Sequence, residues 1–332
     1  MNVTTDDRRR TTIVPEAQRS GADCPSLVVI VGPTAAGKTA LSIELAGALG
    51  GEIVSADSRQ IYRGMDIGTA KATREQRARV PHHLLDVVSP DAVLTLAEYQ
   101  RLAYAAIDEI LARGRLPMLV GGTGQYIHAV VEGWSIPAVA PRPELRAELE
   151  EKAQVEGAAA LHDWLAQLDP TAASHIDYRN VRRVIRALEV CLVTGQPISE
   201  LQRKNPPAYR IKQFGVMRPR PGLYAGIDAR VDRMLEAGLV EEVRSLVATG
   251  YRWELPAMSG LGYRQVGQYL RDEVTLAEAV ALIKKQTRRF VQQQQTWFRA
   301  DDPTIHWLEP GGESLAEMIS LLAAWQTSAD RS

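Results

Sequence analysis

Cysteine is scarce in this sequence: only Cys24 and Cys191 occur among 332 residues. Two cysteines cannot build a disulfide framework, and they are too few for a zinc ribbon or finger. A reducing compartment follows, and we expect the cytoplasm. No apolar run is long enough for a membrane helix, and the first 25 residues contain no stretch of the signal-peptide kind. These absences predict a protein without disulfides and without a membrane partner.

An excess of charge of either sign is also missing. The chain has 39 Lys and Arg against 40 Asp and Glu, a net charge of -1. Such a balance argues against a nucleic-acid partner, because proteins that bind nucleic acid are usually strongly basic. A net charge does not say where the charges lie, however, so this inference stays open. With 45% hydrophobic and 24% charged residues, the composition is that of a globular protein with one large domain or two.

Apolar runs alternate with amphipathic stretches in the first third of the chain. Runs at residues 27–31, 52–56, 84–88 and 116–120 have the length and composition of strands. Residues 40–50 and 95–113 have the pattern of helices, each ending at a glycine. Strands that alternate with helices predict a doubly wound, parallel α/β sheet.

A glycine-rich segment follows the first predicted strand. It fits the pattern G-x-x-x-x-G-K-[ST], and it stands between a strand and a helix as that motif requires. Glycines allow such a loop to turn its N–H groups around phosphate oxygens, and the helix N-terminus adds partial positive charge. The lysine adds a full charge, and the hydroxyl of Thr39 is placed to ligate Mg²⁺. The segment comprises Gly32, Pro33, Thr34, Ala35, Ala36, Gly37, Lys38 and Thr39.

The chain becomes helical in pattern from about residue 141 to 202, which interrupts the alternation. A strand-like run returns at 214–217, and long helices are predicted at 226–248 and 275–299. The predicted fold class is therefore α/β: a P-loop-containing parallel sheet core flanked by helices, with an all-helical insertion domain. Four consecutive glutamines, 292–295, are too few for a low-complexity tract. The predicted domains are a disordered N-terminal extension (1–25), the core (26–138 and 205–310), the insertion (139–204) and a C-terminal helix or tail (311–332).

Two further strand ends carry polar residues. Asp57 follows the second strand, and in a doubly wound sheet that position faces the ligand crevice. Judged alone, Asp57 is equally a metal ligand, a proton acceptor or a capping residue. The segment 121–126, which contains Thr123, is either a turn that holds a substrate or leaving group near the P-loop or a tight turn needed only for packing.

Positive charge is concentrated in the middle of the chain. Residues 171–220 contain ten Lys and Arg against three acids, a local net charge of +7. Arg179, Arg182, Arg183 and Arg186 recur at helical spacing and form one cationic face. No acid lies between residues 178 and 188 to pair with them. The face is either merely solvated or a contact for a phosphate backbone.

A second basic cluster lies on the last long helix. It contains no acid between its members, Lys284, Lys285, Arg288, Arg289 and Arg299. Ahead of it, residues 259–264 form a flexible turn that carries Tyr263 and Arg264. Stacking combined with charge is how proteins hold unpaired RNA bases, so we expect this turn to do so.

The order of several blocks resembles one known family. GPTAAGKT, VSADSRQIYRGMDIGTAK, PHHLLD, LVGGTGQY, RRVIRALEV and SGLGYRQ follow one another as in bacterial tRNA dimethylallyltransferases, also called tRNA isopentenyltransferases. The similarity covers about residues 26–308. It implies transfer of a dimethylallyl group from dimethylallyl diphosphate to N6 of the adenine 3′-adjacent to the anticodon. It also implies Mg²⁺ and an insertion that grips the anticodon stem-loop.

The resemblance assigns roles to individual residues. It implies that residues 32–39 hold the prenyl diphosphate and that Asp57 is the general base. Thr123 would lie near the reacting centre, and Arg230 would reach the diphosphate. Contacts with tRNA are implied for Asp57, Ser58, Arg59, Gln60, Arg146, Arg182, Arg183, Val184, Ile185, Arg186, Ser259, Gly260, Leu261, Gly262, Tyr263 and Arg264.

Two other functions share the P-loop. A small-molecule kinase would use the same loop for ATP but would not need the basic helices. The other is a non-catalytic RNA-binding ATPase or GTPase. The sequence lacks the NKxD motif that reads guanine, which argues against a GTPase. We expect a tRNA prenyltransferase that acts as a monomer.

Overall fold

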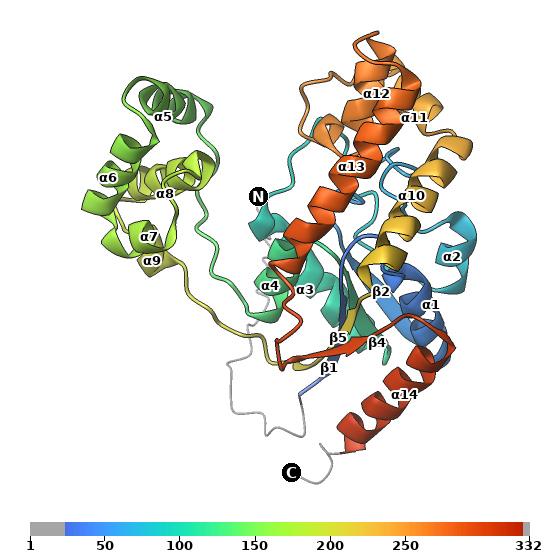
Figure 1. The fold of residues 1–332 in the computed structure, drawn as a ribbon. Helices are drawn as coiled ribbons and strands as arrows, with labels where there is room; N and C mark the ends of the chain where they lie inside the picture. The colour runs from blue at the N-terminus through green and yellow to red at the C-terminus, as the bar shows by residue number, and fades with distance from the viewer. Residues whose placement is uncertain (1–23, 328–332) are drawn as a thin grey trace, which may run out of the picture.

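The computed structural model describes residues 24–327 in two lobes joined by two chain segments (Figure 1). The predicted N-terminal extension falls outside the described residues, except for Cys24 and Pro25, and so do the last five residues of the predicted tail. Among residues 24–327, no helix combines the length and the apolar character needed to cross a bilayer.

The larger lobe is built on a sheet of six parallel strands, which confirms the predicted fold class. The strand order is β3-β2-β4-β1-β5-β6, so the strand that carries the P-loop lies inside the sheet between β4 and β5. The strands are β1 (Ser26–Val31), β2 (Gly51–Ala56), β3 (His82–His83), β4 (Leu116–Gly121), β5 (Arg210–Val216) and β6 (Ile305–Leu308).

Helices cover both faces of this sheet because successive side chains of a strand point to opposite sides. Val28 and Ile30 of β1 pack with residues of α1 (Lys38–Leu49) and α14 (Gly312–Thr327). Leu27, Val29 and Val31 pack on the other face with α3 (Leu96–Ala112) and α4 (Gly124–Val131). The remaining helices described in this lobe are α2 (Arg74–Arg79), α10 (Arg220–Glu236), α11 (Leu239–Ala248), the 3-10 helix η2 (Ala257–Ser259), α12 (Tyr263–Leu270) and α13 (Leu276–Gln295).

Two predicted elements differ from the structure. The predicted strand at 84–88 is wrong: Leu84 and Asp86 have φ values of +63° and +56°, which an extended strand cannot accommodate. The helix predicted at 226–248 is two helices, α10 and α11. The break lies at Gly238, whose φ of +96° suits a residue without a Cβ.

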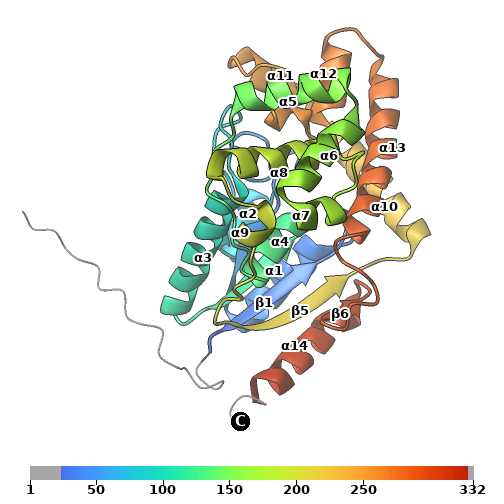
Figure 2. The same cartoon turned by 90° about the vertical axis from the view of Figure 1, so that its left-hand side faces the viewer.

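Helices α5 to α9 form the smaller lobe (Figures 1 and 2). They are α5 (Pro143–Val155), α6 (Ala158–Leu168), α7 (Pro170–His175), α8 (Val181–Thr194) and α9 (Ile198–Leu201). Their buried side chains form a separate hydrophobic cluster that includes Leu161, Leu165 and Leu188. The two connecting segments lie side by side, because Ser135 N–H donates to the Arg203 carbonyl (2.7 Å) and Asn205 N–H to that of Gly133 (2.8 Å).

A buried carboxylate ties this lobe together. Glu189 on α8 is fully buried and accepts hydrogen bonds from the Arg142 N–H (2.8 Å), from Arg146 (2.7 and 2.8 Å) and from Arg186 (2.7 Å). Burial alone would raise the pKa of Glu189, but these donors lower it to about 2. Arg146 of α5 and the N–H of its N-cap residue Arg142 thereby fix α5 against α8, whereas Arg186 pairs with Glu189 within α8.

Replacing this carboxylate should destabilise the smaller lobe. In Glu189→Ala, Arg146 and Arg186 lose their partner, but both are partly exposed, so we expect a loss at the low end of the buried-pair range, about 3 kcal/mol. Chemical denaturation measures this difference in the free energy of unfolding. Glu200→Ala, an exposed residue of α9, is the matched control and should change it by less than about 0.5 kcal/mol. Equal effects of the two substitutions would contradict the structural role of Glu189.

Candidate active site

The P-loop connects the end of β1 to the start of α1. A Cβ at Gly32 would come within 2.2 Å of the Val216 carbonyl oxygen, so only glycine fits there. Gly37 has a φ of +105° and immediately precedes α1. Lys38 reaches back over the loop, and its Nζ donates to the Pro33 carbonyl (2.8 Å). The loop is thus folded around the lysine, as in sites that bind phosphate.

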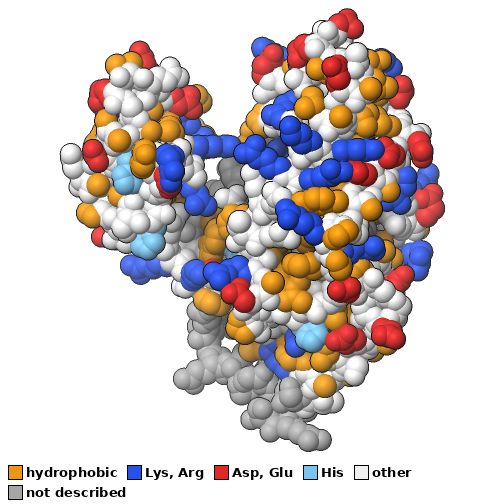
Figure 3. All heavy atoms as spheres, in the orientation of Figure 1, with side chains coloured by type: hydrophobic (Ala, Val, Ile, Leu, Met, Phe, Trp, Pro, Cys, Tyr) orange, Lys and Arg blue, Asp and Glu red, His pale blue; other side chains and the backbone are white. Residues whose placement is uncertain are grey.

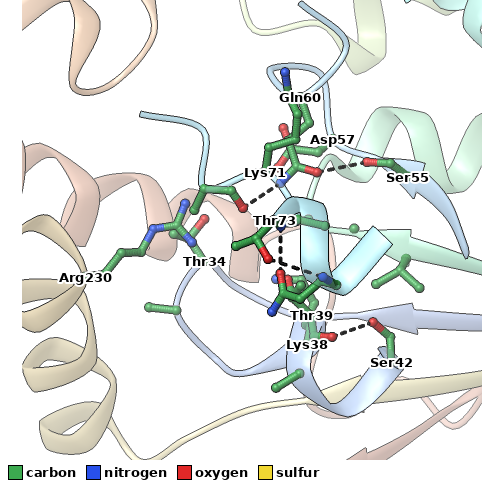
Figure 4. Close-up of a pocket in the computed structure, with 18 of the residues that line it drawn as sticks. Thr34, Lys38, Thr39, Ser42, Ser55, Asp57, Gln60, Lys71, Thr73 and Arg230 are labelled. Atoms are coloured by element: carbon green, nitrogen blue, oxygen red, sulfur yellow. Dashed lines mark hydrogen bonds between the residues drawn. The ribbon is translucent and has the colours of Figure 1, made fainter. Parts of the chain in front are cut away.

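A cavity of about 1040 Å³ opens in front of this loop. Thr34, Ala35, Gly37, Lys38 and Thr39 line it, whereas Gly32, Pro33 and Ala36 are buried behind them. Figure 4 shows Lys38, Asp57 and Arg230 around the same space, although they come from three different segments. Further cations line the cavity: Lys71, Arg74, Arg77, Arg218 and Arg233. This excess of positive charge is suited to a ligand with several negative charges.

Burial disfavours the charged forms of Lys38 and Arg230 at the centre of the site. It lowers the pKa of Lys38 to about 8, while the nearby charge of Asp57 opposes the shift and that of Arg230 adds to it. Burial likewise lowers the pKa of Arg230, again against the effect of Asp57. One carboxylate therefore partly compensates two desolvated cations. An anionic ligand would stabilise both cations further.

The loop after β2 holds Asp57 beside Thr123. One carboxylate oxygen of Asp57 accepts the Arg59 N–H (2.8 Å), and the Ser58 N–H donates to Thr123 Oγ1 (3.0 Å). The Thr123 N–H in turn donates to the Ala56 carbonyl (3.2 Å). The other oxygen of Asp57 has no hydrogen bond from the residues of the described part of the chain. It is therefore free to accept a proton from a ligand.

A second cavity, of about 250 Å³, meets the first at this carboxylate. Asp57, Thr34, Arg230, Met234 and Gln294 line both cavities. The residues that line only the smaller one include Ser58, Arg59, Gly68, Thr69, Thr123, Val231, Ser259, Gly260, Leu261, Gly262, Tyr263, Ile283, Thr287 and Phe290. Two ligands that entered from the two cavities would meet between Asp57 and Arg230.

Arg59 joins two of the predicted RNA-contacting segments. Its guanidinium donates to the Pro256 carbonyl (2.8 Å), which brings the loop after β2 against residues 259–264. Of that turn, Ser259 and Arg264 are exposed, whereas Tyr263 is only 1% exposed. In this structure the Tyr263 ring therefore has little exposed surface on which an RNA base could stack. Hydrophobic packing at the start of α12 places the ring in the core, where its hydroxyl donates to Glu242 (2.6 Å).

Several residues of the site were not found from the sequence. The Glu242 carboxylate accepts the N–H groups of Asp66, Ile67 and Gly68 and so anchors the GMDIG segment. Lys71, almost fully buried, pairs with Asp86 (2.6 Å) and with Asp66. The GMDIGTAK block marks these positions as distinctive, but nothing in the sequence indicates the partners. Gln60, a predicted tRNA contact, uses its amide to hold the carbonyls of Thr69 and Ala70.

The predicted basic face of α8 is only partly available. Arg182 and Arg183 are exposed, whereas Val184 and Ile185 are buried in the core of the smaller lobe. Arg186 and Arg146 are held by Glu189, as described above. None of the six lines either cavity. Figure 3 shows Lys and Arg side chains on both sides of the hollow between the two lobes.

These features define a class: P-loop α/β proteins with a helical insertion, in which a cationic cavity meets a second cavity at one carboxylate. Comparison with known proteins agrees. The family model described as IPP transferase matches residues 60–301. The tRNA dimethylallyltransferase of Roseiflexus sp. (strain RS-1) is 58% identical over 273 residues, which cover 82% of this chain and 90% of the relative. That of Herpetosiphon aurantiacus is 54% identical over 299 residues, 90% of this chain and 95% of the relative.

A solved structure gives the same result. The full-length tRNA isopentenylpyrophosphate transferase from Bacillus halodurans is 40% identical, with a TM-score of 0.68 over 92% of this chain and 98% of its own. The chain belongs to the IPP transferase family, which confirms the resemblance found in the sequence. These relatives do not favour the alternative of a small-molecule kinase.

The lowered pKa of Lys38 predicts how anion binding depends on pH. Lys38 is charged below about pH 8 and neutral above it, and a bound anion would raise its pKa. The affinity for inorganic diphosphate should therefore fall above pH 8, by up to about tenfold per pH unit, and binding near pH 8 should take up protons. Titration calorimetry in buffers of different ionisation enthalpy measures both. In Lys38→Met, the part of the pH dependence of the affinity that arises from Lys38 should vanish. The pH dependence that remains in this variant is that of the titration of diphosphate itself. Identical profiles for the two proteins would contradict this role.

Proposed function

We propose that this protein transfers a dimethylallyl group from dimethylallyl diphosphate to N6 of the adenine 3′-adjacent to the anticodon in tRNA. The observation that carries the proposal is the junction of the two cavities at Asp57 and Arg230. A donor in the cationic cavity and an acceptor in the smaller one would present their reacting atoms to the same carboxylate. The names of the relatives, tRNA dimethylallyltransferases, support this assignment.

The larger cavity suits the donor. A diphosphate in the P-loop would lie against Lys38, and Arg230 would face it from α10. Both cations are desolvated, so each would interact with the diphosphate more strongly than an exposed side chain would. The charge that develops on the leaving diphosphate would therefore be stabilised where the bond breaks.

The chemistry needs one base. The exocyclic amine of adenine is a poor nucleophile because its lone pair is delocalised into the ring. Asp57 would accept a proton from that amine as nitrogen bonds to C1 of the dimethylallyl group, while the C1–O bond breaks and diphosphate leaves. Thr123, whose hydroxyl accepts the Ser58 N–H, would hold the loop that carries Asp57 in place.

The smaller cavity suits a single base taken out of the RNA stack. An adenine cannot reach Asp57 while it is stacked, so it must be splayed into the cavity. Phe290 on α13 is 40% exposed and lines this cavity, so it offers the aromatic surface that the buried Tyr263 does not. Ser259, which lines this cavity, and the exposed Arg264 next to Tyr263 would contact the neighbouring nucleotides.

Mg²⁺ fits the donor side of the site. The hydroxyl of Thr39 is exposed, lines the larger cavity and makes no hydrogen bond within the described part of the chain. Thr39 would hold the ion together with oxygens of the diphosphate. When bound, Mg²⁺ would neutralise part of the diphosphate charge.

The smaller lobe supplies the remaining contact with tRNA. Arg182 and Arg183 are exposed at the start of α8, and we propose that they bind phosphates of the anticodon stem-loop. One chain provides both cavities and both basic helices, so we propose that it acts as a monomer.

The direct test is incubation of the protein with unmodified tRNA, Mg²⁺ and dimethylallyl diphosphate, followed by mass analysis of the nucleosides. N6-isopentenyladenosine should appear only when the prenyl donor is present. ATP in place of the donor tests the kinase alternative. A phosphorylated product with ATP and no prenylated nucleoside would overturn the proposal.

Replacement of the base should slow turnover strongly but leave binding nearly unchanged. Asp57→Asn keeps the shape of the side chain but cannot accept the proton, so we expect kcat to fall by about 10²–10⁴-fold. Single-turnover kinetics at saturating donor measure this loss, and filter binding should give a Kd for tRNA within about threefold of the wild type. Asp163→Asn, an exposed aspartate of α6, is the control. Near wild-type kcat in Asp57→Asn would refute the base assignment.

The exposed arginines should determine the salt dependence of tRNA binding. Arg182→Ala removes one phosphate contact, so the slope of log K against log [salt] should decrease by about 1. Arg115→Ala removes another exposed charge, just before β4 at the amino ends of the strands, and should leave the slope unchanged. If both variants kept the wild-type slope, α8 would have only a solvated face.

A further inference from the structure

A single glutamine connects the P-loop with the loop after β4. Gln294 lies near the end of α13 and is only 5% exposed. Its Oε1 accepts the N–H of Thr34 (2.9 Å), and its Nε2 donates to the carbonyl of Gly122 (2.9 Å). These partners are 260 and 172 residues away in the sequence. One side-chain amide thus joins two loops that belong to different strands.

The two loops carry different halves of the site. Thr34 belongs to the loop that would hold the diphosphate. Gly122 precedes Thr123, whose hydroxyl accepts the Ser58 N–H next to Asp57. The bridge therefore runs from the P-loop through Gln294 to the segment that positions the carboxylate. Gln294 also lines both cavities where they meet.

The surrounding contacts show that α13 does not need Gln294 for its own attachment. Val291 and Phe298 are buried on either side of it. Ion pairs of Lys284 with Asp232 and of Arg288 with Asp228 fasten the helix to α10, which also carries Arg230. Both hydrogen bonds of Gln294, by contrast, go to loops of the site. Gln295, the next residue, is exposed, and its side chain makes no hydrogen bond to any residue between 24 and 327.

We infer that Gln294 is a positioning residue that sets the distance between the P-loop and the Asp57–Thr123 pair, and so aligns donor and acceptor. The inference rests on the proposed function. Because a displacement of about 1 Å between reacting groups can cost about 10²-fold in rate, loss of this bridge should reduce turnover far more than binding.

The first test compares Gln294→Leu with Gln295→Leu. Leucine has a similar size but neither accepts nor donates, so kcat should fall about 100-fold in Gln294→Leu. The Kd values for tRNA and for dimethylallyl diphosphate should stay within about threefold, because the lysine, the arginines and the RNA-facing surface are unchanged. Gln295→Leu should retain wild-type kcat. All assays are made well below the Tm of each variant.

A second variant separates positioning from folding. In Gln294→Glu the carboxylate can still accept from Thr34 but repels the Gly122 carbonyl, whereas the protonated carboxyl can donate to it. The kcat of Gln294→Glu relative to the wild type should therefore recover as the pH is lowered from about 8.5 to about 6. A flat ratio across this range would overturn the inference.

Amide hydrogen exchange tests the bridge without reference to catalysis. The Thr34 N–H should exchange faster in Gln294→Leu and at the wild-type rate in Gln295→Leu. Unchanged exchange in Gln294→Leu would overturn the inference even if the wild type proved inactive toward tRNA. Wild-type kcat in Gln294→Leu, or a loss of kcat matched by an equal loss of affinity for either substrate, would also overturn it. An inactive wild type would instead reject the proposed function.

Discussion

The structure depends on one constraint: all six strands of the sheet are parallel, so their carboxyl ends lie at the same end of the sheet. The loops after β1, β4 and β2, which are consecutive strands in the sheet, carry Lys38, Thr123 and Asp57. These residues are far apart in the chain, yet each needs only to follow its own strand to reach the site. Arg230, from α10, completes the group from outside the sheet. The hydrogen bonds of Thr123 and Gln294 then fix the spacing that the sheet brings about only approximately.

The electrostatics at the carboxyl ends of the strands favour an anionic ligand. Lys38 and Arg230 are both desolvated, and the charge of Asp57 partly offsets the effect of burial on both. Desolvation penalises the free protein, and a ligand that binds only the folded state returns part of that free energy. The same desolvation would strengthen the attraction between these cations and a diphosphate. The buried cations thus lower the stability of the free protein and strengthen the binding of a negatively charged substrate.

The fate of the basic residues shows why local charge is a weak guide to an interface. The window 171–220 has a net charge of +7, yet its members serve different purposes. Arg218 donates to the carbonyl of Ala36 in the P-loop, and Arg210 stacks on Trp325 of α14. Arg186 pairs with Glu189, an acid just beyond the segment that the sequence shows to be free of acids. Only Arg182 and Arg183 of the predicted face remain exposed with no partner among the described residues.

The sequence by itself determined the strand–loop–helix unit at residues 27–49, the parallel sheet, the helical insertion and the family, because each depends on local periodicity or on contiguous motifs. It also predicted Asp57 and Thr123 as site residues, because they follow the ends of β2 and β4 by one and two residues. Only the tertiary structure decided that Tyr263 is buried, that residues 84–88 are not a strand, and that Glu242 and Gln294 hold loops of the site. Each of these depends on contacts with other segments of the chain, and the pattern around a residue contains no information about such contacts. For the same reason, the glutamine tetrad 292–295 was uninformative until the fold placed one of its members, Gln294, between two loops.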